Sequence, residues 1–365
     1  MITRLSMLFG LLLLGASQHA AMAAGDVYSV ENVAVDQTAE TAAAARDIAL
    51  AGGQQRALRR LLERLTLAAD HRRLPEVAKK AIAELVKGIE ISEEKTSPKR
   101  YIATLSVTFK KERVRGLLRA NGISFSETRA KPILLLPVFR AGGAVRLWQD
   151  PNAWRDAWSN VTIGSDAPVP FVVPAGELAD VASISATQAL AGDKRRLDVI
   201  ADRYGVGDTL VAFAELDVDL ATRAKRLQVS LRQQGPTGPN LIVESFSSAG
   251  QETEAALITR AVAGIAVGIQ ERWKEATLIR FDKERSLSAR VPLSGLRDWI
   301  VVRKRLTDNS LVQRVDLTSL SVESARVVLH YWGDIERLAI ALTQSNLRLE
   351  EDTNGFWTVI RFDGS

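Results

Sequence analysis

Apolar residues recur along this chain with two periods, one helical and one of two residues, and the two patterns alternate. Val27 to Val35 predicts a strand, and the alanine-rich segment from about Ala39 to Ala69 predicts a long helix. Arginines occupy the other faces of this helix, as an amphipathic helix that covers a sheet requires. Its apolar stripe consists of Ile48, Leu58, Leu61, Leu62 and Leu65. Gly52-Gly53 interrupts the helix, which indicates close packing, a small kink or a hinge.

The rest of the first unit alternates between helices and strands. A second helix is expected from Pro75 to Gly88, because proline is tolerated in the first turn and glycine ends helices. From Tyr101 to Phe109 every second residue is apolar, which predicts a strand with one buried face. A short helix from Lys111 to Ala120 follows. We therefore expect a β-α-α-β-β-α domain over residues 24–130, bounded by the polar stretch Ser126 to Lys131.

A middle domain is expected over residues 131–285. It begins with an uninterrupted apolar run, Pro132 to Phe139, which is typical of a central strand covered on both faces. Helices and strands then alternate, so we expect a mixed sheet with covering helices. The further strands are Thr209 to Leu220, Lys225 to Gln233 and Leu241 to Phe246, and the main helices are Asp193 to Gly205 and Glu252 to Lys274.

The last unit, residues 286–365, predicts the order β-α-β-β-α-β of a ferredoxin-like domain. Asn354-Gly355 indicates a hairpin before a final strand, Phe356 to Ile360. The fold class expected for the whole chain is thus α+β, built from three small α/β units.

The amino terminus has the pattern of a secretory signal over residues 1–23. Arg4 precedes an apolar stretch, Leu5 to Gly15, that is too short to cross a bilayer as a helix. Ala21-Met22-Ala23 offers a cleavage site before Ala24. The alternative is a retained membrane anchor. Since the chain has no cysteine, lipidation after the signal is excluded, and we expect a soluble periplasmic protein with no transmembrane segment after cleavage.

Composition narrows the chemistry further. The formal charge of +5 is mild and the basic residues are dispersed, so a nucleic-acid partner is not expected. The absence of cysteine and the presence of only 3 histidines disfavour a metal site, and His71 in a basic run is expected at a solvated helix end. We expect no metal and no cofactor.

Catalytic motifs are weak. Gly142-Gly143 follows a strand but has no Gly-Lys-Ser/Thr after it, and no Gly-x-Ser-x-Gly sequence occurs. Glu215, Asp217 and Asp219 share one face of a predicted strand. They could bind a cation or serve glycoside hydrolysis, or they could form the solvated face of the strand beside Arg226. The pattern favours a protein that is not an enzyme.

Three tryptophans are the candidate binding residues: Trp148, Trp154 and Trp158. Trp154 and Trp158 are four residues apart, so on a helix they would share one face. Two accounts are open. The face packs on the sheet, or it is an exposed anchor for a partner, because tryptophan is enriched at binding hot spots and stacks on sugar rings.

Three segments together resemble an uncharacterised family of exported Gram-negative bacterial proteins, a domain-of-unknown-function family. They are Arg56 to Leu65, Tyr101 to Gly122 and Lys131 to Val138, and the resemblance extends over about residues 26–360. The first two units are also similar in layout to flagellar assembly protein T, and the middle unit to the amino-terminal domain of TolB. These resemblances imply a scaffolding or assembly role and supply no catalytic residue.

From these patterns we expect a periplasmic, non-catalytic binding or assembly factor of the cell envelope. Its expected partner is another envelope protein, with cell-wall glycan as a second option. The alternative function is an envelope glycan-binding protein or hydrolase that uses the Trp148 to Trp158 segment.

Overall fold

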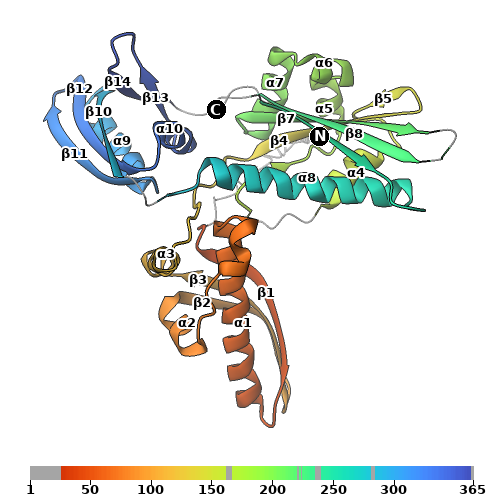
Figure 1. Ribbon diagram of the computed structural model, residues 1–365, viewed down its shortest axis with the longest axis horizontal. Coiled ribbons are helices and arrows are strands. Elements are labelled where there is room, and N and C mark those ends of the chain that lie inside the picture. The colour runs from red at the N-terminus through yellow and green to blue at the C-terminus, as the bar shows by residue number, and fades with distance from the viewer. Residues whose placement is uncertain are drawn as a thin grey trace, which may run out of the picture.

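The computed structural model describes residues 26–161, 167–219, 222, 224–234, 240–280 and 284–362. It contains three sheets, each with its own helices, and has the α+β fold that the sequence predicted (Figure 1). The expected signal segment, residues 1–23, lies outside the described residues.

The first unit is a three-stranded antiparallel sheet in the order β1-β3-β2, with helix α1 packed on it. Apolar residues of α1 and the alternating apolar residues of β3 are buried against each other. Gly53 lies where α1 meets the sheet, and a Cβ atom there would be 2.5 Å from Cδ1 of Leu105. Close packing therefore accounts for Gly53. The elements are β1 Ser29–Thr38, α1 Ala42–Leu65, η1 Ala68–Arg73, α2 Lys79–Leu85, β2 Val86–Thr96, β3 Arg100–Phe109 and α3 Lys111–Ala120.

The second helix is shorter than the sequence predicted. It starts at Lys79, and strand β2 follows at Val86 without a turn, so Gly88 lies inside a strand. Residue Gly88 pairs with Thr108 of β3. The expected stop at Gly88 was wrong because pairing with β3 outweighs the local preference of glycine for a helix end.

The middle unit is a six-stranded mixed sheet whose main path runs β5-β4-β7-β8-β9. Strand β4 is buried on both faces, as its apolar run predicted: Leu135 and Phe139 face one apolar cluster, and Leu134 and Leu136 face the other. Helices α4 and α8 cover the first side, and α6 and α7 cover the second. The elements are β4 Ile133–Ala141, β5 Ala144–Arg146, α4 Ala153–Asn160, β6 Phe171–Val172, α5 Leu178–Ser183, α6 Ala186–Ala191, α7 Lys194–Tyr204, β7 Asp208–Val218, β8 Lys225–Gln234, β9 Asn240–Ser247 and α8 Glu254–Ala276.

The third unit has a five-stranded sheet in the order β11-β12-β10-β14-β13, with α9 and α10 packed against it. The elements are β10 Glu284–Pro292, α9 Leu296–Asp308, β11 Val312–Leu320, β12 Ser324–Trp332, α10 Ile335–Gln344, β13 Leu347–Glu351 and β14 Trp357–Arg361.

This sheet departs from the ferredoxin-like arrangement at one point. The strand after the second helix would lie beside β10 in that arrangement, but β14 takes that place and runs parallel to β10. Among the described residues, strand β13 pairs with β14 alone and lies at the edge. The more apolar strand has taken the inner position: Val359 of β14 is fully buried, whereas Glu350 and Glu351 of β13 are exposed.

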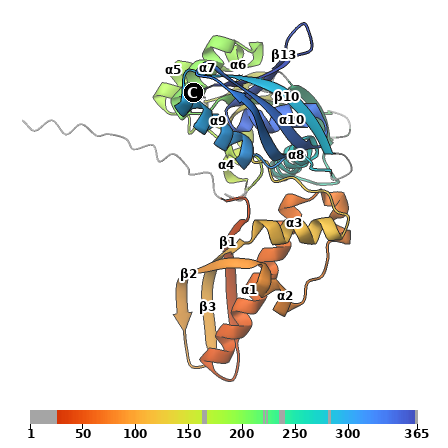
Figure 2. The same cartoon turned by 90° about the vertical axis from the view of Figure 1, so that its left-hand side faces the viewer.

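The three units meet around the carboxyl-terminal end of α8. Helix α8 runs beneath the middle sheet, the first unit extends away from it, and the third unit lies at the end of α8 (Figure 1). The turned view shows α3 of the first unit close to this meeting point (Figure 2). Buried apolar residues of the first and third units form one connected cluster. The core thus continues across the junction between these two units.

Candidate functional site

The structure buries all three tryptophans that the sequence singled out. Trp154 and Trp158 lie on α4 with their ring centroids 5.8 Å apart, and their shared face packs on the middle sheet. The Trp154 Nε1 donates to the carbonyl oxygen of Ala212 at 2.9 Å. Trp148 belongs to the apolar cluster on the other side of the sheet, where its Nε1 donates to the Ile184 carbonyl oxygen at 2.7 Å.

Sheet packing, the first of the two accounts left open by the sequence, is therefore what the structure shows for these residues. The tryptophans lie in two separate clusters and present no common surface to a partner. The alternative account, a surface anchor formed by these tryptophans, is therefore corrected. The apolar face of α4 is buried because it forms part of the core beneath the sheet.

The acidic residues of β7 do not converge. Glu215 pairs with Arg140 at 3.0 Å, and the exposed Asp217 lies opposite Arg226 on β8. Asp219 accepts a hydrogen bond from the backbone N–H of Thr222 at 2.8 Å. In the part of the chain that the structure describes, no group of three or more histidine, cysteine or acidic side chains is placed to hold a metal ion.

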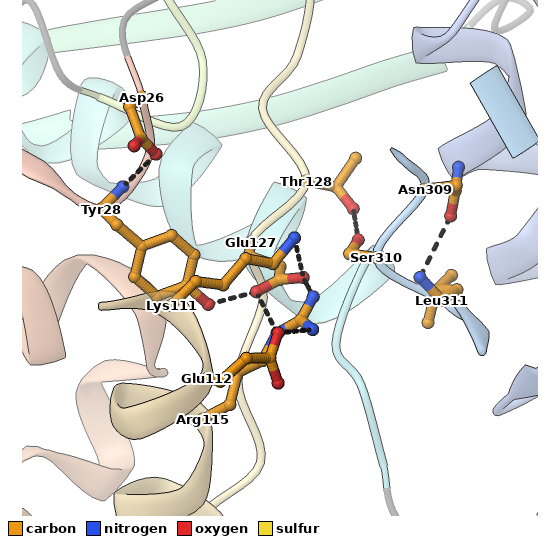
Figure 3. A network of polar contacts seen from close by, with 10 residues as sticks. All are labelled: Asp26, Tyr28, Lys111, Glu112, Arg115, Glu127, Thr128, Asn309, Ser310 and Leu311. Carbon is orange, nitrogen blue, oxygen red and sulfur yellow. Dashed lines mark hydrogen bonds and ion pairs between the residues drawn. The ribbon is translucent and has the colours of Figure 1, made fainter. Parts of the chain in front are cut away.

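A buried polar network lies within the first unit, beside its junction with the third unit, and its centre is Glu127 (Figure 3). The Glu127 side chain is almost fully buried and forms an ion pair with Arg115, whose Nε donates at 3.0 Å. The Tyr28 hydroxyl donates to the same carboxylate, and the Lys111 ammonium lies 3.7 Å from it. Burial, together with the Glu127 charge, raises the pKa of Tyr28 well above its ordinary value, so this hydroxyl remains a donor.

The network borders a hollow of about 280 Å³ between the first and third units. Thr128 meets Ser310 across it with their hydroxyl oxygens 3.3 Å apart. The oxygens of Glu127 are already engaged by Tyr28 and Arg115, so this carboxylate is suited to holding elements together rather than to proton transfer.

A second set of contacts fastens the first unit to α8. The Lys274 ammonium donates to the carbonyl oxygen of Thr66 at 2.6 Å and pairs with Glu271 at 2.5 Å. Glu271 in turn accepts from the backbone N–H of Ala68 at 2.9 Å. The hydroxyl oxygens of Ser126 and Thr277 are 2.6 Å apart. The segment after α1 and the segment that contains Ser126 are thus both bonded to α8.

A third set of hydrogen bonds connects the stretch from Ser126 to Lys131 to the middle and third units. The backbone N–H of Lys131 donates to Gln344 of α10 at 2.8 Å, and its ammonium donates to Asn346. Trp273 of α8 donates to the Thr128 carbonyl oxygen at 2.6 Å. The stretch Ser126 to Lys131 was expected to mark a domain boundary. In the structure it carries contacts to all three units, and Ser126 and Glu127 are buried.

Sequence reasoning did not identify Glu127, Lys274 or Glu271 as residues of a site. Each looks like an ordinary charge in a polar segment or on a helix. The pattern of α8 gave no signal for Lys274: it follows Ile265 by nine residues, or two and a half turns, and so lies on the side of the helix opposite Ile265.

On the outer surface, the edge of strand β9 is open. It is the last strand in its sheet, and the path found among the described residues ends there. Leu241 is 59% exposed and Val243 is 70% exposed, while the alternate residues Ile242 and Phe246 pack toward α8. The two exposed side chains therefore share the face of the strand that points away from α8.

Comparison with known families gives one match. Residues 21–127 match a family described as a domain of unknown function, DUF8605. No curated protein and no solved structure matches the chain. The matched stretch spans the first sheet with its helices and ends at Glu127. A domain of unknown function is thereby confirmed for this stretch, and the similarity to flagellar assembly protein T and TolB stays a prediction.

None of the helices in the described part of the chain combines the length and the apolar character that crossing a bilayer requires.

Proposed function

We propose that the protein is an exported, non-catalytic assembly factor of the bacterial cell envelope that holds an extended segment of another envelope protein along the open edge of β9. The observation that carries this proposal is the exposure of Leu241 and Val243 on that edge strand. An open edge offers backbone N–H and C=O groups to an added strand, and alternate side chains provide specificity.

The composition of β9 supports this role by contrast with another edge. Strand β2 carries lysines and glutamates along its exposed length, which is how proteins ordinarily protect an edge from pairing. Strand β9, Asn240–Ser247, has no lysine and no proline. Its one charge, Glu244, pairs with Arg272 of α8 at 3.3 Å and so lies on the other face.

The polar junction supports an assembly role as well. Hydrogen bonds tie the first unit to α8, and the stretch Ser126 to Lys131 to α10, which a protein needs if it is to hold partners at a fixed separation. The export pattern of residues 1–23 agrees with a place in the envelope.

Photo-crosslinking in intact cells tests the proposal. A photoreactive residue replaces Val243 in one variant and Val267 in a control; Val267 is 60% exposed, but on helix α8. We expect a discrete adduct from position 243 in the osmotic-shock fraction, abolished by Leu241→Lys, and none from position 267. Equal adducts from both positions, or an adduct that survives Leu241→Lys, would contradict docking on β9.

The non-catalytic part of the proposal has its own test. Asp217→Asn together with Asp219→Asn should leave both cellular function and the adduct at position 243 unchanged. Loss of function while the adduct persists and the protein stays folded would favour the hydrolase instead.

A further inference from the structure

A second hollow, of about 220 Å³, lies between the middle and third units. Its walls come from the middle sheet, from the carboxyl-terminal half of α8 and from α10. Most of the lining is apolar and includes Leu210, Leu231, Ile242, Ile269 and Ile340. Pockets for drug-sized ligands measure roughly 300–1,000 Å³. This hollow is smaller, so its occupant is a small molecule or a single short chain.

Two polar groups in the wall lack hydrogen-bond partners among the described residues. One is Oδ1 of Asp208, a residue that is 8% exposed, and the other is the buried Nη2 of Arg272. Burial raises the pKa of Asp208, with Lys131 and Gln233 opposing the shift. Buried polar atoms are rarely left unsatisfied, because each costs free energy, and such atoms in a pocket wall mark positions that a ligand can satisfy.

We propose that this hollow binds a small molecule with an apolar chain and an uncharged head group that both donates and accepts hydrogen bonds, such as a primary amide or an alcohol. The head group would donate to Oδ1 of Asp208 and accept from Nη2 of Arg272. The apolar chain would lie against Leu231, Ile242 and Ile269.

The two wall groups select against charge on the ligand. A charged head of either sign would be attracted by one of these groups and repelled by the other, so little electrostatic gain offsets the cost of removing its charge from water. A neutral head group that donates and accepts avoids this desolvation cost and satisfies both atoms. The wall therefore distinguishes ligands with equal chains by their head groups.

The position of the hollow gives binding a structural effect. Ile340 and Gln344 belong to α10, and Gln344 also accepts from the backbone of Lys131. An occupant would touch the middle and third units together. Because the hollow exists only when the middle and third units are in contact, an occupant should stabilise that contact.

Calorimetric titration of the full chain with three probes of equal chain length, octanamide, octanoate and octylammonium, tests the assignment. We expect octanamide to bind at least about tenfold more tightly than either charged probe and to raise the melting temperature. N-acetyl-leucinamide, run beside octanamide, tells whether a peptide amide or an aliphatic chain fits better. Absence of octanamide binding, or equal binding of all three probes, would overturn the proposal.

Two variants locate the binding. Ile269→Trp fills the hollow and should abolish octanamide binding, whereas Val267→Trp, on the exposed side of the same helix, should not. Asp208→Asn preserves shape and removes the negative charge, so it should raise octanoate affinity about tenfold relative to octanamide. If both tryptophan variants bind octanamide as well as the unaltered protein, or if Asp208→Asn changes nothing, the ligand lies elsewhere and the proposal fails.

Discussion

The ammonium group of Lys274, in the last turn of α8, donates to the backbone carbonyl oxygen of Thr66 at the end of α1, 2.6 Å away. The two residues are 208 positions apart in the sequence, and Lys274 is only 4% exposed. This one contact links the first unit to the helix on which the middle unit is built.

Lys274→Met should therefore weaken the attachment of the first unit. Removing one member of a buried charged pair costs roughly 3 to 5 kcal/mol, because the remaining partners lose their compensation. We expect the free energy of unfolding in urea to fall by about 3 kcal/mol and the transition to become less cooperative. Lys304→Met, which breaks an exposed pair with Asp308, serves as the control and should change stability by less than about 1 kcal/mol. Similar losses in both variants would contradict a structural role for Lys274.

The adjacent glycines of α1 should respond in opposite directions to alanine. A Cβ on Gly53 would overlap Leu105 and lie 2.9 Å from Cγ1 of Val35, so Gly53→Ala should cost about 1 to 3 kcal/mol. The nearest atom to a Cβ on Gly52 is the Arg56 guanidinium at 3.6 Å, an ordinary contact. Gly52→Ala should add up to about 1 kcal/mol through helix propensity. Thermal melts of the two variants measure both effects, and destabilisation by Gly52→Ala would contradict the assignment of close packing to Gly53 alone.

Tyr28→Phe removes the hydroxyl that donates to Glu127 (Figure 3). A hydrogen bond to a buried carboxylate contributes about 1.5 to 3 kcal/mol, so we expect a loss of about 2 kcal/mol in chemical denaturation. Tyr331→Phe is the matched control. Tyr331 is also buried, and its hydroxyl has no hydrogen bond within the described residues, so its removal should be nearly neutral. Equal effects would mean that Tyr28 contributes by packing alone.

The Glu252 carboxylate should stabilise the fold in a pH-dependent way. Hydrogen bonds from Arg260 lower the pKa of Glu252 to about 2 from 4.5, and the Ala249 backbone N–H adds to the effect. Because the pKa of the folded state is the lower one, the stabilisation is complete above about pH 4.5 and is lost as the pH falls toward 2. Denaturation of the protein and of Glu252→Gln should thus differ near neutral pH and converge in acid. A difference that does not depend on pH would exclude this ionisation as its source.

Local patterns in the sequence predicted most of the elements, because the periods of apolar residues reflect which face of each helix or strand is buried. The fully apolar run of β4 and the alternation in β3 are the plainest cases. The place of β14 between β10 and β13 could not be predicted, because it depends on which of two neighbouring strands offers the better core residue.

The candidate sites were less accessible to prediction. Trp154 and Trp158 share one helical face whether that face is buried or exposed, so spacing alone could not separate the two accounts. The residues that connect the three units could not be predicted because their partners are distant in the sequence: Thr128 contacts Ser310, and Lys131 contacts Gln344. The unsatisfied atoms of Asp208 and Arg272 become visible only when three separate elements enclose them.

The inner position of β14 also affects when the third unit can fold during synthesis. Strand β10 is made more than 60 residues before β14, yet the parallel neighbour that completes its sheet is Trp357–Arg361. Strand β13 pairs with β14, so its pairing must also wait until β14 has been made. A chain truncated in the turn around Gly355 would leave β10 with an open edge where β14 pairs. The unit is therefore expected to close in one late step, after β14 has left the ribosome, and released chains truncated before Trp357 should be sensitive to protease in this region while the first unit is resistant.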